Sequence, residues 1–137
     1  MNLYNTCTLS NGLRIIHLPT SSHVVYCGYE INVGSRNERF LQCGLAHFCE
    51  HATFKGTKRR RVWAISNALE RVGGDLNAFT NKEDTGFHAA ILKEHTPQAI
   101  DLLTDMVFHS VYPEEELAKE KDVICDEIDS YNDSPAE

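Results

Sequence analysis

The sequence predicts an α+β fold, with a mixed or antiparallel sheet and helices packed on one of its faces. Three observations lead to this class. Short segments of alternating apolar and polar residues, bounded by Asn-Gly or Gly-Gly, indicate strands. Longer segments with apolar residues three and four apart indicate helices. The two kinds do not alternate as in a parallel βαβ chain, and 137 residues suffice for a single domain.

The chain is expected to begin with a hairpin followed by a longer strand. Residues 6–9 and 13–18 flank the turn Ser10-Asn11-Gly12, and Asn-Gly is a strong hairpin signal. Residues 24–33 alternate apolar and polar side chains, which is typical of a strand with one buried face. Gly34-Ser35 is expected to end this strand.

Two helices are expected next. The first runs from Gly44 to Lys55, with Gly56 in the C′ position after its end. The second runs from Val62 to Val72 and ends at Gly73-Gly74. The residues expected to face the core are Leu45, Phe48, Ala52, Val62, Ile65, Leu69 and Val72.

A second strand pair and two more helices complete the prediction. Residues 76–80 and 85–92 are the strands. Thr96 is expected to cap a helix that ends near His109. The last helix is expected over residues 113–131. The apolar positions of these two helices are Ala99, Leu102, Leu103, Met106, Val107, Leu117, Val123, Ile124, Ile128 and Tyr131.

Composition narrows the class of protein. Thirteen Lys and Arg against twenty Asp and Glu give a net charge of −7, which argues against nucleic acid as the main partner. The basic run 58–61 is interpreted as a solvated loop, with a local anion patch as the alternative. No apolar window approaches the ~18 residues of a membrane span, and no secretory signal is visible. Five cysteines without a C-x-x-C pair indicate a cytoplasmic location.

The stretch His47-Phe48-Cys49-Glu50-His51 places two imidazoles and a carboxylate on one side of the first helix. Two histidines at this spacing can hold one Zn²⁺, and Glu50 can take a proton from a metal-bound water. The order H-x-x-E-H inverts the commoner H-E-x-x-H and is a metallopeptidase signature. Cys43, one turn earlier, shares the metal face but is interpreted as a small buried filler.

Two carboxylates on the last helix provide a second signal. Glu120 and Glu127 are seven residues apart and fall on its apolar face. An ionised carboxylate turned toward a core requires a partner. Glu127 would be an anionic third zinc ligand if this helix packs against the first, and Glu120 would orient a ligand or a substrate group. The alternative is that both side chains reach solvent on a broad amphipathic helix.

Three blocks resemble the pitrilysin/insulinase family of zinc metallopeptidases. They are residues 33–57, which include the H-x-x-E-H motif, residues 73–85 with Gly-Gly-Asp-Leu-Asn-Ala-Phe-Thr, and residues 120–128. The resemblance covers essentially the whole chain. It implies the family's metallohydrolase fold and zinc-dependent metalloendopeptidase activity. It also implies that His47, His51 and Glu127 bind Zn²⁺, that Glu50 is the catalytic base and that Glu120 supports the site.

The same resemblance implies partners. The segment with Asn77 and Ala78 would be an edge strand that pairs with the backbone of a peptide or small-protein substrate. Family members have two related halves that enclose a chamber. Residues 1–137 are therefore expected to be the zinc-bearing amino-terminal portion of one half, from a longer protein or a shortened relative. A second homologous half or subunit would close the chamber.

Two alternatives remain from the sequence. The chain could be a non-catalytic family subunit, or a zinc-binding fragment, that binds peptide or a partner without cleaving it. It could instead resemble a zinc lyase with an H-x-x-E-H motif and a cysteine as third ligand, a role that Cys125 would have to fill. Cys125 lies ~200° from Glu127 around the helix, so both cannot face the metal.

Overall fold

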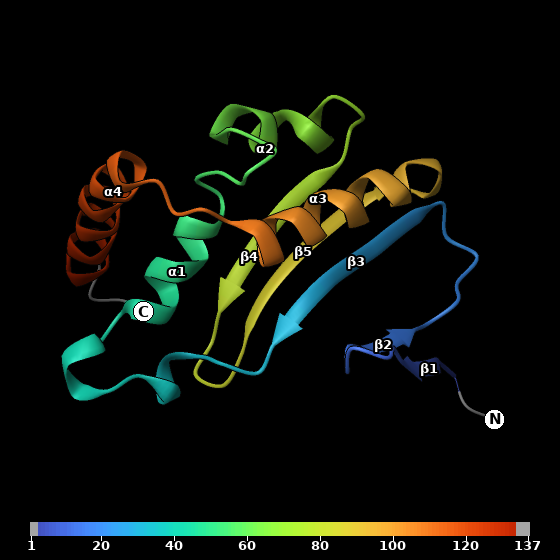
Figure 1. The fold of residues 1–137 in the computed structure, drawn as a ribbon, viewed down its shortest axis with the longest axis horizontal. Coiled ribbons are helices and arrows are strands. Elements are labelled where there is room, and N and C mark those ends of the chain that lie inside the picture. Colours follow the sequence, from blue (N-terminus) through green and yellow to red (C-terminus); the bar gives the residue numbers. More distant parts are fainter. Residues whose placement is uncertain (1–2, 134–137) are drawn as a thin grey trace.

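The computed structural model describes residues 3–133 and confirms the α+β class (Figure 1). Strands and helices occur in the predicted order, with short 3₁₀ turns at residues 35–37, 40–42 and 93–95. The elements are β1 (Asn5–Thr8), β2 (Arg14–His17), β3 (Val24–Ile31), α1 (Leu45–Thr53), α2 (Val62–Glu70), β4 (Asp75–Thr80), β5 (Thr85–Leu92), α3 (Thr96–His109) and α4 (Glu114–Asn132).

The main sheet has three antiparallel strands in the order β3-β5-β4. Because β5 is central, β4 is an edge strand, and Asn77 and Ala78 lie opposite His88 and Phe87 of β5. Strands β1 and β2 form a separate hairpin around the predicted turn, where Gly12 has a φ of +89°. This hairpin is exposed along both strands.

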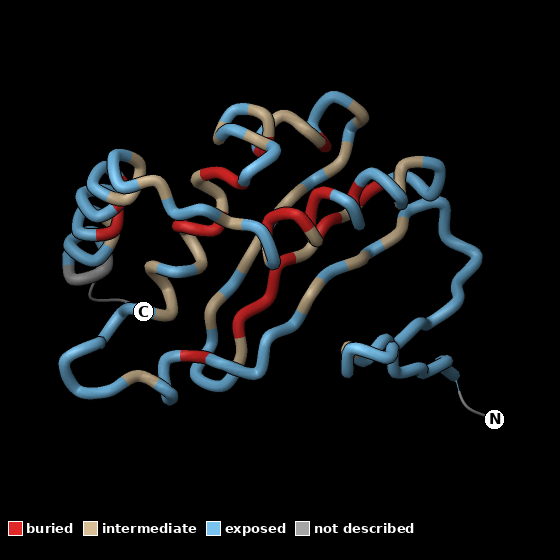
Figure 2. The backbone as a smooth tube through the Cα atoms, viewed as in Figure 1, coloured by how far each residue is buried: buried red, intermediate tan, exposed pale blue. Residues whose placement is uncertain are grey.

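The core lies between one face of the sheet and the helices α2 and α3 (Figure 2). The predicted core positions of α3 are buried except for Val107, which is partly buried against the core. Each fully buried Leu or Ile stabilises the fold by about 1.5–3 kcal/mol. The other face of the sheet is open, and Tyr26 on it is 78% exposed. The buried residues of the core are Ile65, Leu69, Phe87, Ala89, Ile91, Ala99, Leu102, Leu103 and Met106.

Helix α4 has a narrower buried face than the periodicity predicts. Ile124 is buried, but Val123 and Ile128 are each 51% exposed, so their assignment to an inward face is wrong. The side chain of Tyr131 lies outside the described residues. Helix α4 packs against α1 rather than against the sheet, and a contact between two helices buries only a strip of each.

The ends of α1 and α3 differ from the prediction. Helix α1 stops at Thr53 with Phe54 as its C-cap, so Gly56 lies beyond the C′ position, although its φ of +134° still requires glycine. Thr96 does not cap α3, because a 3₁₀ turn precedes the helix and supplies His95 as the N-cap residue. The hydroxyl of Thr96 instead donates to the carbonyl of Lys93 at 2.8 Å.

The basic run 58–61 is partly engaged inside the protein, so neither the solvated loop nor the anion patch describes it fully. Arg60 forms ion pairs with both Asp101 and Asp105 of α3. Asp105 is 1% exposed and accepts a hydrogen bond from the hydroxyl of Thr57 at 2.7 Å. These contacts tie the α1–α2 loop to α3, while Lys58 stays exposed.

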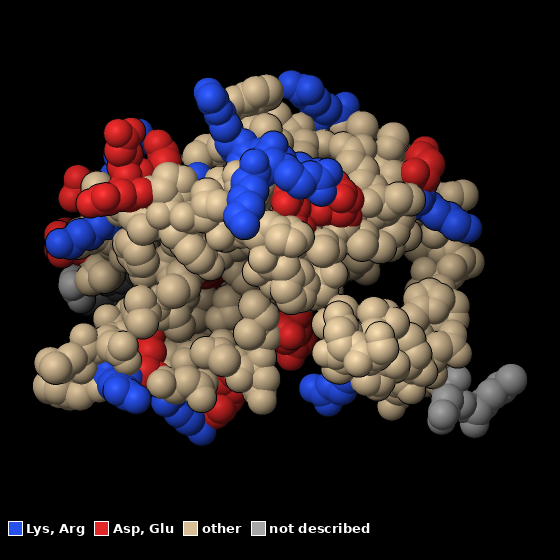
Figure 3. All heavy atoms as spheres, viewed as in Figure 1, with Lys and Arg blue, Asp and Glu red and all other residues tan. Residues whose placement is uncertain are grey.

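Charged side chains of both signs are distributed over the visible face of the molecule (Figure 3). Acidic side chains gather over α4, and basic side chains lie beside acidic ones near α2 and α3, so this face has no continuous basic stripe. Within residues 3–133, none of the helices combines the length and apolar character that a membrane crossing requires.

Asp105→Asn is expected to lower the free energy of unfolding by about 2–3 kcal/mol at neutral pH, because it leaves Arg60 without its most buried partner. Burial raises the pKa of Asp105, but the hydrogen bonds from Thr57 and Arg60 outweigh it and hold the pKa below its usual range. The carboxylate's stabilisation is therefore present above the unfolded pKa of ~3.9 and is lost as the pH falls through the lower folded value. Urea denaturation of both proteins as a function of pH measures this.

The matched control is Asp101→Asn. Asp101 bonds to Arg59 and Arg60 but is exposed, so its loss should change stability by less than about 1 kcal/mol. Equal losses in the two variants would contradict a special role for the buried carboxylate. A difference between parent and Asp105→Asn that stays constant down to acidic pH would do the same.

Candidate metal centre

Helix α1 is oriented at its start by Glu38. Gly44 adopts a left-handed conformation with a φ of +85°, and α1 begins at the next residue. The carboxylate oxygens of Glu38 accept hydrogen bonds from the backbone N–H groups of Gly44 (2.9 Å) and Ala46 (2.7 Å). A negative charge is favourable at this end of a helix. The sequence pattern does not indicate that Glu38 caps α1, because a capping box joins residues three positions apart and Glu38 is six residues before Gly44.

Cys43 does not have its predicted role as a buried filler. Its side chain is exposed, and its Sγ donates a hydrogen bond to the carbonyl of Phe40 at 3.3 Å. The residue lies in the irregular segment before α1, so it is not held on the helix face that carries His47.

His47 and His51 of α1 and Glu127 of α4 each place one potential ligand atom within 4.8 Å of the others. The two Nε2 atoms are 3.0 Å apart. Oε2 of Glu127 is 3.7 Å from Nε2 of His51 and 3.9 Å from Nε2 of His47. The two helices lie side by side (Figure 1). His51 and Glu127, which are 76 positions apart in the sequence, therefore come close to each other.

These distances fit a zinc ion. Metal–ligand bonds of roughly 2.0–2.2 Å in a tetrahedral site require donor atoms roughly 3.3–3.6 Å apart. The three observed separations of 3.0, 3.7 and 3.9 Å lie around this range, so small side-chain adjustments suffice. Two imidazole nitrogens and one carboxylate oxygen are a known donor set of catalytic zinc sites, which keep a fourth position open.

Glu120 of α4 orients His51. Its Oε1 is 2.8 Å from Nδ1 of His51, so this nitrogen donates the hydrogen bond and Nε2 is the ring nitrogen available to a metal. Glu120 is only 6% exposed, and Nζ of Lys55 forms an ion pair with its other oxygen. Burial raises the pKa of Glu120, but the hydrogen bonds from Lys55 and His51 outweigh it and hold the pKa below its usual range.

Glu50 lies on α1 directly before His51 and is not one of the three clustered donors. The hydroxyl of Thr80, at the end of β4, donates a hydrogen bond to Oε2 of Glu50 at 2.5 Å. This contact holds the carboxylate beside the edge strand. Sequence reasoning missed Thr80 because nothing in its local pattern links it to α1.

The free edge of β4 exposes the backbone of Ala78. Along an antiparallel ladder, only every second residue of a strand is hydrogen-bonded to the neighbouring strand. The N–H of Asn81 donates to the carbonyl of Asp84, so Asn77, four residues earlier, also bonds to β5. The N–H of Ala78, which is out of this alternation, points away from β5. That N–H donates to Oδ1 of the Asn77 side chain at 3.2 Å. Asn77 is exposed and Ala78 half-buried.

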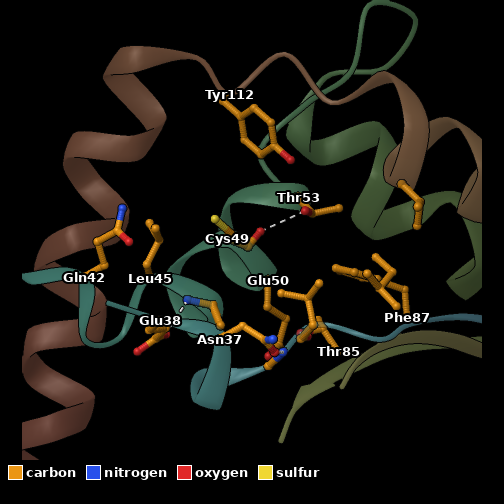
Figure 4. Close-up of a pocket in the computed structure, with 15 residues that line it drawn as sticks. Asn37, Glu38, Gln42, Leu45, Cys49, Glu50, Thr53, Thr85, Phe87 and Tyr112 are labelled. Carbon is orange, nitrogen blue, oxygen red and sulfur yellow. Dashed lines mark hydrogen bonds between the residues drawn. The ribbon is translucent and has the colours of Figure 1, made fainter. Parts of the chain in front are cut away.

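A pocket of about 270 Å³ lies beside Glu50 (Figure 4). Its wall is mainly apolar and includes Cys49 and Tyr112. Burial raises the pKa of the Cys49 thiol, and the charge of Glu38 raises it further. The two histidines and Glu127 do not line this pocket, so it is distinct from the metal-ligand cluster.

The third donor in the cluster is a carboxylate rather than a thiolate. Cys125 is exposed, whereas Glu127 on the same helix reaches the histidine pair. This arrangement does not support the cysteine-ligated lyase.

Comparison with known proteins adds independent information. Residues 14–137 match the model of the family Insulinase (Peptidase family M16). The chain is 45% identical over 130 residues to an uncharacterized zinc protease, YmxG, of Bacillus subtilis (strain 168), covering 93% of this chain and 32% of that protein. It is 41% identical over 122 residues to a probable mitochondrial-processing peptidase subunit beta of Arabidopsis thaliana, covering 88% and 23%.

A solved structure agrees with these relatives. The fold is similar to the crystal structure of a protease from Helicobacter pylori, with a TM-score of 0.87 and 28% sequence identity. The match covers 90% of this chain and 30% of that one. The chain thus spans about a third or less of the length of the proteins that it matches.

Proposed function

Because this chain belongs to the insulinase family, peptidase family M16, we propose that it is the zinc-bearing part of a metalloendopeptidase. The observation that carries the proposal is the meeting of His47, His51 and Glu127, with a separate carboxylate, Glu50, on the same helix as the two histidines. We assign the three to the metal and Glu50 to proton transfer. We further propose that residues 1–137 are the amino-terminal portion of one half of a two-half enzyme.

The chemistry follows from these roles. When bound, Zn²⁺ would act as a Lewis acid that lowers the pKa of water and polarises a peptide carbonyl. Glu50 accepts the proton of the attacking water and passes it to the leaving amine as the C–N bond breaks. His51 keeps Nε2 directed toward the other donors because Glu120 holds its Nδ1.

We place the substrate backbone along the free edge of β4. A peptide in extended conformation would add a strand there and accept the hydrogen bond of the Ala78 N–H, which now goes to the Asn77 side chain. The Thr80–Glu50 contact joins this edge to the catalytic base. A second homologous half closing the site would hold the peptide in place.

Thr80→Val is expected to lower kcat about tenfold while zinc content and KM stay near the parent values. The variant keeps the shape of the side chain but removes the donor to Glu50, and hydrogen bonds to charged groups contribute about 1.5–3 kcal/mol. Steady-state cleavage of a quenched fluorescent peptide measures the effect, and Thr80→Ser should retain activity. Loss of zinc in Thr80→Val, or equal activity of Val and Ser variants, would refute the orienting role.

A peptidase assay tests the function itself. The chain should bind stoichiometric zinc, and cleavage should be seen when it is joined to the remaining portion of a full-length relative. A chelator should abolish cleavage and added zinc should restore it. Zinc binding by a completed protein that cleaves no peptide would favour the non-catalytic subunit instead.

A further inference from the structure

Lys55 completes a line of contacts that ends at His51. Its Nζ lies 2.5 Å from Oε2 of Glu120, and the two side chains are 21% and 8% exposed. The other oxygen of Glu120 is the one that receives the hydrogen bond of His51 Nδ1. The buried carboxylate of Glu120 therefore contacts His51 through Oε1 and Lys55 through Oε2.

We propose that Lys55 is a positioning residue for the metal centre. By holding one oxygen of Glu120, it fixes the other on His51, and the ring of His51 then presents Nε2 to His47 and Glu127. This inference rests on the proposed zinc site and adds a residue to it. Lys55 acts through Glu120, which is the carboxylate that its ammonium group pairs with among residues 3–133.

The local fold explains why Lys55 reaches this carboxylate. Lys55 follows the end of α1, and its backbone N–H still donates to the carbonyl of Ala52 at 3.0 Å. It lies four residues after His51, and both side chains contact the same carboxylate. Glu120, on the packed helix α4, faces both of them.

Loss of the ammonium group would leave one oxygen of a buried carboxylate without its partner. Oε2 of Glu120 would lose its hydrogen bond and remain out of contact with water, which is unfavourable for a charged oxygen. The carboxylate would therefore turn toward another donor or toward water. The single orientation that holds His51 would then be lost.

A simple charge effect predicts the opposite sign. A lysine near a divalent cation repels it, so removing the lysine would strengthen zinc binding if charge alone mattered. If Lys55 acts by positioning, its removal weakens zinc binding. The direction of the change therefore separates the two explanations.

The test is zinc affinity in competition with a chromophoric chelator, using the 137-residue chain. Lys55→Met should weaken zinc binding about tenfold, at the lower end of the range for partners of metal ligands. Lys55→Arg should restore most of the affinity. Lys119→Met is the matched control, since Lys119 precedes Glu120 in sequence but is exposed and pairs with Glu116; its affinity should equal the parent's.

A double-mutant cycle shows whether Lys55 acts through Glu120. In a Glu120→Gln background, Lys55→Met should have no further effect on zinc affinity. The proton signal of the His51 Nδ1–H in the zinc-loaded protein should be protected from exchange in the parent and Lys55→Arg, and lost in Lys55→Met. Circular dichroism checks the fold, and Lys55→Gln replaces the Met variant if that one does not fold.

The outcomes are distinguishable. If the parent chain binds no zinc, the proposed function fails. If the parent binds zinc and Lys55→Met binds it equally well or more tightly, the positioning role of Lys55 is wrong. Additive effects of the two substitutions in the cycle would also overturn it, because Lys55 would then act independently of Glu120.

Discussion

Glu50→Gln is expected to retain zinc and lose hydrolysis, with kcat falling by about 10²–10⁴-fold, the usual contribution of a general base. The amide has nearly the shape of the carboxylate and can still accept the hydrogen bond from Thr80, but it cannot take up a proton. Because Glu50 is not one of the three clustered donors, zinc content should be unchanged. Peptide cleavage and elemental analysis on the same preparation measure both quantities.

Glu114→Gln is the matched control, since it makes the same chemical change at an exposed position at the start of α4. It should leave both kcat and zinc content at the parent values. Cleavage by Glu50→Gln at the parent rate would show that another group takes the proton. A parallel loss of zinc would show instead that Glu50 helps to hold the metal.

His51→Ala is expected to lose zinc, with Kd rising on the order of 10³-fold if three donors share about 12 kcal/mol of binding free energy. The substitution removes one of the two nitrogen donors and also leaves Oε1 of Glu120 without its partner. Isothermal titration with zinc should show the loss, and hydrolysis should disappear with it.

His17→Ala serves as the control, because His17 lies on the exposed strand β2, outside the metal-ligand cluster. Zinc affinity should not change in this variant. Circular dichroism of metal-free His51→Ala should match that of the parent, so that loss of zinc can be separated from unfolding. Parent-like zinc affinity in folded His51→Ala would remove His51 from the ligand set.

Much of the fold could be predicted because its elements have clear local signals. The Asn-Gly turn between β1 and β2 and the apolar spacing of Leu102, Leu103 and Met106 both correspond to what the structure shows. The predictions that are wrong concern positions whose capping or burial depends on contacts with other parts of the chain. Thr96 was expected to cap α3, but the preceding 3₁₀ turn supplies His95. Val123 and Ile128 of α4 were expected to be buried, but α4 packs only along a strip of α1.

The candidate site was predictable in its residues but not in its arrangement. Periodicity places Glu120 and Glu127 on one face of α4, yet it does not say which helix they meet. Strand order depends on long-range pairing, so the family resemblance rather than the local pattern predicts β4 as an edge strand, and the structure confirms it. Lys55 and Thr80 went unnoticed because each contacts the site through a residue that is distant in sequence.

Anomalous scattering at the zinc edge, from crystals of the zinc-loaded chain, tests the central claim most directly. We expect a single ion bound by Nε2 of His47, Nε2 of His51 and a carboxylate oxygen of Glu127, at roughly 2.0–2.2 Å. An ion that Glu127 does not contact, one bound by Cys125 or a peak away from the histidine pair would contradict it.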